Sequence, residues 1–330
     1  MLLDPETPPD SWDYSKPDFK FIDLFAGIGG MRIAFESAGG KCVYTSEWDA
    51  NAQKTYQANF GDLPSGDITQ VNENEIPDFD VLLAGFPCQP FSTIGQREGF
   101  KHKTQGTLFY DVLRIIEAKK PSGFLLENVK GLVSHDGGKT LRIILESLTS
   151  IGYQVQYKIL DAADFGVPQY RKRIYIVGFD TNKIKSAIKF FWPKPSKGKV
   201  GIGQFIESGI QDHSISEHLQ KSYFNKLDDG RPQIITRESD FPVKTLVSTY
   251  HKIQRLTGTF VKDGPTGVRL LTANECKAIM GFPKNFKIPV SRTQMYRQMG
   301  NSVAVPVVRA LAKEIAATLL NSKVIKKQLS

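Results

Sequence analysis

The chain has 330 residues, of which 40% are hydrophobic and 23% are charged, a balance typical of globular proteins rather than disordered ones. Its 43 Lys and Arg residues exceed its 34 Asp and Glu residues, and the resulting net charge of +9 favours anionic partners such as nucleic acid. No apolar run approaches the ~18 residues of a membrane helix, no signal-peptide pattern begins the chain, and three cysteines are too few for a disulfide framework. We therefore expect a cytoplasmic protein without membrane association.

From Phe19 onward, short apolar runs alternate with segments of helical periodicity. Strands are expected at 20–27, 41–49, 80–86, 122–129, 153–166 and 173–179. Helices are expected at 31–39, 51–60, 108–119 and 140–152. Because strands that alternate with helices form βαβ crossovers, the pattern predicts a doubly wound, mostly parallel α/β sheet of the Rossmann-like kind, with helices on both faces.

The alternation stops after about residue 183, and residues 181–268 hold 14 Lys and Arg against eight Asp and Glu. Short β-like stretches are expected there at 232–237, 243–250 and 258–261, which indicates a second, smaller and irregular β-rich domain. A final helix at 304–320 is expected to return to the first domain. The predicted parts are a flexible tail (1–18), a main domain (19–185 with 300–330), a small domain (186–272) and a hinge (273–299).

A glycine-rich turn containing Gly27 follows the first predicted strand and leads into a helix, an arrangement typical of nucleotide binding. Glu47 lies 20 residues further on, at the end of the next strand, where a carboxylate would accept hydrogen bonds from ribose hydroxyls. Trp48 would cover an adenine face, and Asp67 is a second polar candidate. The pattern predicts an adenosine-containing cofactor. The turn alone does not distinguish a nicotinamide dinucleotide from S-adenosylmethionine. Its glycine order, however, disfavours the dinucleotide.

Reactive side chains follow or precede several of the predicted strands. Cys88 comes just after the third strand, Glu127 ends the fourth, and Arg171 and Arg173 precede the last. Ligands of doubly wound sheets bind at the carboxyl ends of strands, so convergence of these groups favours a catalytic site, although Cys88 alone could equally be structural. The five histidines show no zinc-ligand spacing, and no metal site is expected.

Six motifs occur in a fixed order: DLFAGIGG, GFPCQPFS, ENV, QYRKR, RLLTANECKAIMGFP and QMYRQMGNSVAVP. This series resembles that of the DNA (cytosine-5) methyltransferases, over roughly residues 19–315. The length and spacing are similar to those of compact bacterial restriction-modification enzymes. The resemblance implies sequence-specific transfer of a methyl group from S-adenosylmethionine to C5 of a cytosine that is flipped out of duplex DNA.

The resemblance also implies catalytic roles for particular residues. Cys88 would attack C6 of the cytosine, and Glu127 would hold the N3/N4 edge of the ring. Arg173, with Arg171 nearby, would bind the O2 side or an adjacent phosphate. Asn128 would support the loop that carries the cysteine.

The same resemblance assigns binding residues. The cofactor pocket would comprise Phe25, Gly27, Ile28, Gly29, Glu47, Trp48, Asp67, Ile68, Pro87 and Asn301. Residues 92–106 would close over DNA, 186–272 would form the target-recognition domain, and Gln233 would be a candidate to fill the place of the flipped base. Expected DNA contacts are Gln89, Ser92, Arg97, Arg231, Gln233, Arg237, Thr245, Tyr250 and Lys252.

The expected partner is double-stranded DNA, bound by a monomer in the bacterial cytoplasm. A cognate restriction endonuclease would act on the same site without forming a stable complex with this chain. Two alternatives remain open: a transfer RNA cytosine-5 methyltransferase and a non-catalytic DNA-binding protein of the same fold. An NAD oxidoreductase is a more remote alternative.

Overall fold

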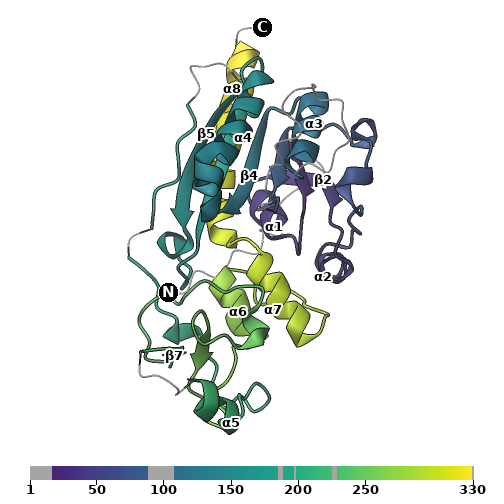
Figure 1. Ribbon diagram of the computed structural model, residues 1–330. Coiled ribbons are helices and arrows are strands. Elements are labelled where there is room, and N and C mark those ends of the chain that lie inside the picture. Colours follow the sequence, from purple (N-terminus) through teal and green to yellow (C-terminus); the bar gives the residue numbers. More distant parts are fainter. Residues whose placement is uncertain (1–16, 88–107, 185–188, 197, 225–228, 329–330) are drawn as a thin grey trace.

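A computed structural model of the protein describes residues 17–87, 108–184, 189–196, 198–224 and 229–328 (Figure 1). Its centre is a six-stranded sheet of order β2-β1-β3-β4-β6-β5. The strands are β1 (Phe19–Leu24), β2 (Gly40–Ser46), β3 (Val81–Ala84), β4 (Gly123–Val129), β5 (Tyr153–Asp161) and β6 (Lys172–Asp180). The first four are parallel, whereas β6 runs antiparallel to both β4 and β5. The predicted strands and the mostly parallel α/β fold are confirmed.

Helices cover both faces of the sheet. The expected ones are α1 (Gly30–Glu36), α2 (Ala50–Phe60), α3 (Phe109–Lys119), α4 (Lys139–Ser150) and α8 (Val305–Gln328). Side chains alternate along β1, so that Phe21 joins the core that includes α1 and α8 while Ile22 joins the core that includes α3 and α4. Among the described residues, no helix is both long and apolar enough to cross a membrane.

The small domain contains β7 (Gln233–Ile235) and β8 (Thr259–Val261), which pair in parallel, and the short helix α5 (Glu217–Leu219). The strand prediction for 243–250 is wrong. Val243 forms only an isolated bridge with Gln169, and a 3₁₀ turn begins at Tyr250. Its backbone pairs through Val243 with the residues that precede β6, and not with the backbone of a strand in its own domain.

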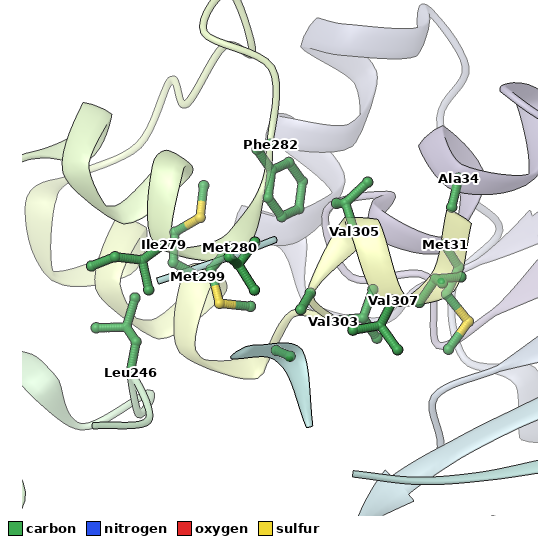
Figure 2. Close-up of a cluster of buried hydrophobic side chains, with 14 of the residues drawn as sticks. Met31, Ala34, Leu246, Ile279, Met280, Phe282, Met299, Val303, Val305 and Val307 are labelled. Atoms are coloured by element: carbon green, nitrogen blue, oxygen red, sulfur yellow. The ribbon is translucent and has the colours of Figure 1, made fainter. Parts of the chain in front are cut away.

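The range expected to be a hinge is mostly helical. Helix α6 (Ala273–Met280) begins with a capping box formed by Thr272 and Glu275, and α7 (Arg292–Asn301) begins at the cap residue Ser291. Both helices contribute side chains to the core that also includes α1, α8 and the small domain (Figure 2). The two domains therefore share one continuous core.

A fully buried arginine fastens the end of the small domain to α6. Arg269 donates two hydrogen bonds of 2.8 Å to the carboxylate of Glu275 and one of 2.9 Å from Nε to Asp263. It also donates to the Glu207 carbonyl at 2.7 Å. Every charge in this cluster has a partner, as burial of charged groups requires.

Replacement of Arg269 by Met should leave the buried Glu275 carboxylate without its cation. We expect the free energy of unfolding to fall by about 3–5 kcal/mol, the usual cost of breaking a buried ion pair from one side. Urea denaturation would measure the loss. Arg142→Met is the matched control, because Arg142 lies 4.0 Å from Glu146 on an exposed surface and should cost less than about 1 kcal/mol. Equal losses in the two variants would contradict the role given to Arg269.

Candidate active site

A cavity of about 740 Å³ opens at the carboxyl ends of the parallel strands. Its walls come from the turns after β1, β2 and β3, the end of β4, the start of β6 and the α7 region. Neighbouring parallel strands end at one edge of the sheet, which is why segments distant in sequence meet there. Pro87 lies in the wall, while Cys88, the next residue of the chain, falls outside the described residues.

The turn after β1 has a left-handed backbone at Phe25 (φ 56), Gly27 (φ 57) and Gly29 (φ 85). Gly27 lines the cavity, and a Cβ atom added to it would have no atom within 4 Å. Gly29 does not line it, since a Cβ there would lie 2.2 Å from the Phe60 ring. The other nine residues expected to bind the cofactor all line the cavity: Phe25, Gly27, Ile28, Glu47, Trp48, Asp67, Ile68, Pro87 and Asn301.

Two polar groups and one exposed ring surround the cavity near β2. Glu47 accepts hydrogen bonds of 2.8 Å from the backbone N–H groups of Gly27 and Asp49. Burial raises the pKa of the Glu47 carboxyl, and these backbone donors oppose that rise. Trp48 is 79% exposed, so the described residues leave most of its large apolar ring uncovered. Asp67 caps a short turn by accepting from the Thr69 N–H at 2.9 Å.

Asp23, which the residue-by-residue reading of the sequence missed, also lines the cavity. Its side chain is 1% exposed, and its Oδ2 atom has no hydrogen-bond partner in the described part of the chain. Burial raises the pKa of this carboxyl, with the positive charge of Arg32 acting against the rise. Its place as the first residue of the DLFAGIGG motif was the available signal. A cationic or hydrogen-bond-donating ligand group would complete its hydrogen bonding.

Glu127 and Arg173 form an ion pair in the cavity wall. The antiparallel register of β4 and β6 sets Val129 opposite Arg173, so the end of one strand lies beside the start of the other. Arg173 Nε lies 3.2 Å from Glu127 Oε1. Burial raises the pKa of the Glu127 carboxyl, although Arg173 and Arg171 both lower it. A largely buried acid beside a fixed guanidinium can hold the two polar edges of a planar ring.

Arg171 is also buried, and both of its Nη atoms are bonded within the protein. It donates to the carbonyls of Leu246 (3.1 Å), Gly300 (3.0 Å) and Ser302 (2.6 Å). Burial and the nearby charge of Arg173 lower the pKa of Arg171 to about 10. The Nη groups of this arginine therefore join three protein segments.

Asn128 lies beside the segment that leads to Cys88. Its Nδ2 donates to the Phe86 carbonyl at 2.9 Å, and its Oδ1 accepts from the Val129 N–H at 2.8 Å. Phe86 precedes Cys88 by two residues, so the amide holds the backbone just before the cysteine.

The expected DNA contacts fall into three groups. Gln89, Ser92, Arg97 and the proposed closing loop lie outside the described residues, whereas Arg231, Arg237 and Lys252 are exposed on the small domain. Thr245 donates from its hydroxyl to the Tyr170 carbonyl at 2.6 Å.

Two of the residues expected to contact DNA have partners inside the small domain. Tyr250 is 4% exposed and its hydroxyl donates to the Thr259 carbonyl at 2.6 Å, which places it in the core of the domain and corrects its assignment as a surface contact. The Gln233 side-chain oxygen accepts from Thr259 Oγ1 at 2.6 Å and from the Lys244 N–H at 3.2 Å. Its insertion into DNA would require both bonds to break.

Comparison with known proteins places these features in a family context. The family model of the C-5 cytosine-specific DNA methylases matches residues 19–317. The Type II methyltransferase M.MspI of a Moraxella species is 60% identical over 307 residues, which cover 93% of this chain and 72% of that protein. The Type II methyltransferase M.BsuFI of Bacillus subtilis is 57% identical over 301 residues, covering 91% and 73%.

Solved structures share the fold at lower identity. The structure of a Spodoptera frugiperda DNMT2 mutant superposes with a TM-score of 0.74 at 23% identity, covering 90% of this chain and 99% of that one. S. pombe Dnmt2 gives a TM-score of 0.72 at 23% identity, covering 92% and 98%. At this identity the likeness concerns the fold alone.

Replacement of Gly27 by Ala should weaken cofactor binding, because the added methyl group would occupy ligand space. Gly61→Ala is the matched control: Gly61 is also left-handed (φ 79) with nothing within 4 Å of an added Cβ, but it does not line the cavity. Both variants should lose about 1–2 kcal/mol of stability from backbone strain. Calorimetry with S-adenosylhomocysteine should show about a tenfold or greater loss of affinity, about 1.4 kcal/mol, for G27A only. Equal affinities in the two variants would exclude a ligand next to Gly27.

Proposed function

The chain belongs to the C-5 cytosine-specific DNA methylase family, and from this premise we propose the part that each cavity residue plays in methyl transfer. The enzyme is a DNA cytosine-5 methyltransferase of the type II restriction-modification class. A transfer RNA methyltransferase and a non-catalytic DNA-binding protein are less well supported. The observation that supports the proposed mechanism best is the Glu127–Arg173 pair in the wall of the cavity that also contains the segment leading to Cys88.

The cavity residues fit S-adenosylmethionine, the cofactor on which this family depends. The ammonium group of the methionine would donate to Asp23 Oδ2, which has no hydrogen-bond partner among the described residues. Ribose hydroxyls would donate to Glu47, and the exposed ring of Trp48 would cover the adenine. When bound, the cofactor supplies an electrophilic methyl group attached to sulfonium sulfur. No metal takes part in the proposed reaction.

Cys88 makes C5 of the cytosine nucleophilic. C5 and C6 are inaccessible in stacked DNA, so the base must first leave the helix. The Cys88 thiolate adds to C6, and the π electron pair of the C5–C6 double bond moves onto C5, in conjugation with the rest of the ring. Once C5 carries the methyl group, a base removes the C5 proton. The electron pair of that C–H bond restores the double bond and expels the thiolate.

Glu127 and Arg173 stabilise the charge that develops on the ring. Glu127, whose pKa is raised by burial, would share a proton with N3 as charge develops on the ring, and Arg173 would donate toward O2. Asn128 keeps the backbone before Cys88 in place through the Phe86 carbonyl. Arg171 would support this site through its bonds to three carbonyls on two other segments, at Leu246, Gly300 and Ser302.

The enzyme acts on double-stranded DNA as a monomer, because one chain carries both the catalytic and the recognition parts. Arg231, Arg237 and Lys252 supply exposed positive charge for contacts with phosphates or guanine. A cognate endonuclease would cleave the same unmethylated site without binding this chain stably. We place the reaction in the cytoplasm, where bacterial DNA is found.

Incubation with S-adenosylmethionine and unmethylated duplex DNA, followed by bisulfite sequencing, should reveal 5-methylcytosine in one short sequence context. Cys88→Ala should abolish this methylation because it removes the thiolate that adds to C6. Cys42→Ala is the matched control: burial raises the pKa of the Cys42 thiol to about 12, so it carries almost no thiolate and its loss should leave the rate unchanged.

Two results would contradict this function. Methylation by C88A at the wild-type rate would exclude the covalent mechanism. A folded wild-type protein that binds the cofactor but methylates no duplex would redirect the assay to transfer RNA as acceptor.

Glu127→Gln should lower the single-turnover rate by about 10²–10⁴, the usual contribution of a proton donor. In the wild type, the protonated carboxyl is the active form, so the rate should fall as pH rises through the raised pKa of Glu127. The amide cannot ionise, and E127Q should lack this decline. Rates measured from about pH 6 to pH 9 test both effects, with the exposed Glu146→Gln as control. A wild-type rate and profile in E127Q would contradict the role.

A further inference from the structure

Three segments that are far apart in the sequence meet beside the Glu127–Arg173 pair. They are residues 168–171, which lead into β6, residues 243–248 of the small domain, and residues 300–302 at the end of α7. Each belongs to a different part of the chain, and the first lies directly before the residue proposed to bind the cytosine. We refer to this meeting point as the junction.

Backbone hydrogen bonds align the first two segments of the junction. The Tyr170 N–H donates to the Val243 carbonyl at 2.9 Å, and the Val243 N–H donates to the Pro168 carbonyl at 2.8 Å. The Thr245 hydroxyl adds a bond to the Tyr170 carbonyl. The small domain is thus attached in a defined register to residues 168–171, the segment that precedes β6.

Gln169 lies at the centre of the junction with 0% exposure. Its Oε1 accepts from the Leu246 N–H at 2.7 Å, while its Nε2 donates to the Ile279 carbonyl at 3.1 Å and lies 3.2 Å from Met280 Sδ. The Leu246 side chain belongs to the same buried cluster as Ile279 and Met280 (Figure 2). One amide therefore holds the small domain against both β6 and α6.

Both backbone polar groups of Leu246 are hydrogen-bonded across the junction. Gln169 accepts from its N–H, and Arg171 donates to its carbonyl at 3.1 Å. Gly300 closes the junction from α7, where an added Cβ would lie 2.2 Å from the Ser248 nitrogen. The backbones of Gly300 and Ser248 therefore pack without space for a side chain between them.

We propose that Gln169 is a positioning residue that fixes the DNA-reading domain in register with Arg173, four residues further along the same segment. The inference rests on the proposed roles of Glu127 and Arg173. DNA bound by the small domain brings its flipped cytosine to that pair at an offset set by the junction. Because a misplacement of about 1 Å can reduce a rate by about 10²-fold, the register controls methyl transfer more than it controls binding.

Gln169→Leu tests the proposal, since it removes both bonds and keeps an apolar side chain of similar size. The matched control is Gln220→Leu: Gln220 Nε2 donates to the Ile215 and Thr266 carbonyls at 2.7 and 3.0 Å, both within the small domain. Each variant should lose stability. Only Q169L should show a single-turnover methylation rate, at saturating DNA and cofactor, that is about 10–100-fold lower, with S-adenosylhomocysteine affinity unchanged. A Q169L rate within twofold of the wild-type rate would overturn the proposal.

Gln169→Glu provides a second test that does not depend on how well Q169L folds. A protonated glutamic acid offers one acceptor for the Leu246 N–H and one donor for the Ile279 carbonyl, whereas the ionised form lacks the donor. The rate of Q169E relative to the wild type should therefore rise as pH falls. A ratio that does not change with pH would overturn the proposal. Absence of wild-type methylation in the same assay would overturn the function on which the proposal rests.

Discussion

The antiparallel placement of β6 beside β4 is the constraint on which the rest of the site depends. In an all-parallel sheet, the residues before β6 would lie at the opposite edge, about 30 Å away for a strand of nine residues. The reversal brings Arg171 and Arg173 to the edge where β4 delivers Glu127 and Asn128. It also directs the chain before β6 toward the small domain, so the proposed catalytic and DNA-reading parts share one segment of backbone.

Charged groups are buried in both the small domain and the cavity of the main domain, but their hydrogen-bond partners differ between these two places. In the small domain, carboxylates or carbonyls accept from each nitrogen of the Arg269 guanidinium. These bonds connect the end of the small domain to α6. Around the cavity, burial raises the pKa of both Asp23 and Glu127, and Asp23 Oδ2 has no hydrogen-bond partner in the described part of the chain. Uncompensated polar groups cost stability, and their concentration where ligands bind indicates that the missing partners belong to those ligands.

The local pattern of the chain predicted most of the fold and most of the cavity. Alternating apolar runs located the strands, and the turns after β1 and β2 marked Gly27, Glu47, Trp48 and Asp67, whereas the other cavity residues were expected from the family resemblance alone. The pattern failed where a partner distant in sequence decides the outcome. Residues 243–250 have strand-like composition but bond to residues 168–171, and Tyr250 has the character of a DNA contact but is buried by Thr259 and Leu271.

Helix α6 and Gln169 show the difference between local and long-range signals in the sequence. The Thr272–Glu275 capping box was present in the sequence and could have located α6, since a capping box marks a helix start without reference to tertiary contacts. The structural role of Gln169 had no such marker. Its hydrogen-bonding partners, Leu246 and Ile279, are 77 and 110 residues away in the chain.

The shared core and the junction bear on the exchange of recognition domains between related enzymes. A graft of residues 186–272 alone would carry Leu246 but leave behind Gln169, which bonds to its N–H, and Gly300, which packs against Ser248. A chimera that retains its parent's affinity for DNA could then fail to modify it. On the proposed role of the junction, transplanted specificity requires that residues 168–171 and the last turn of α7 be matched to the incoming domain.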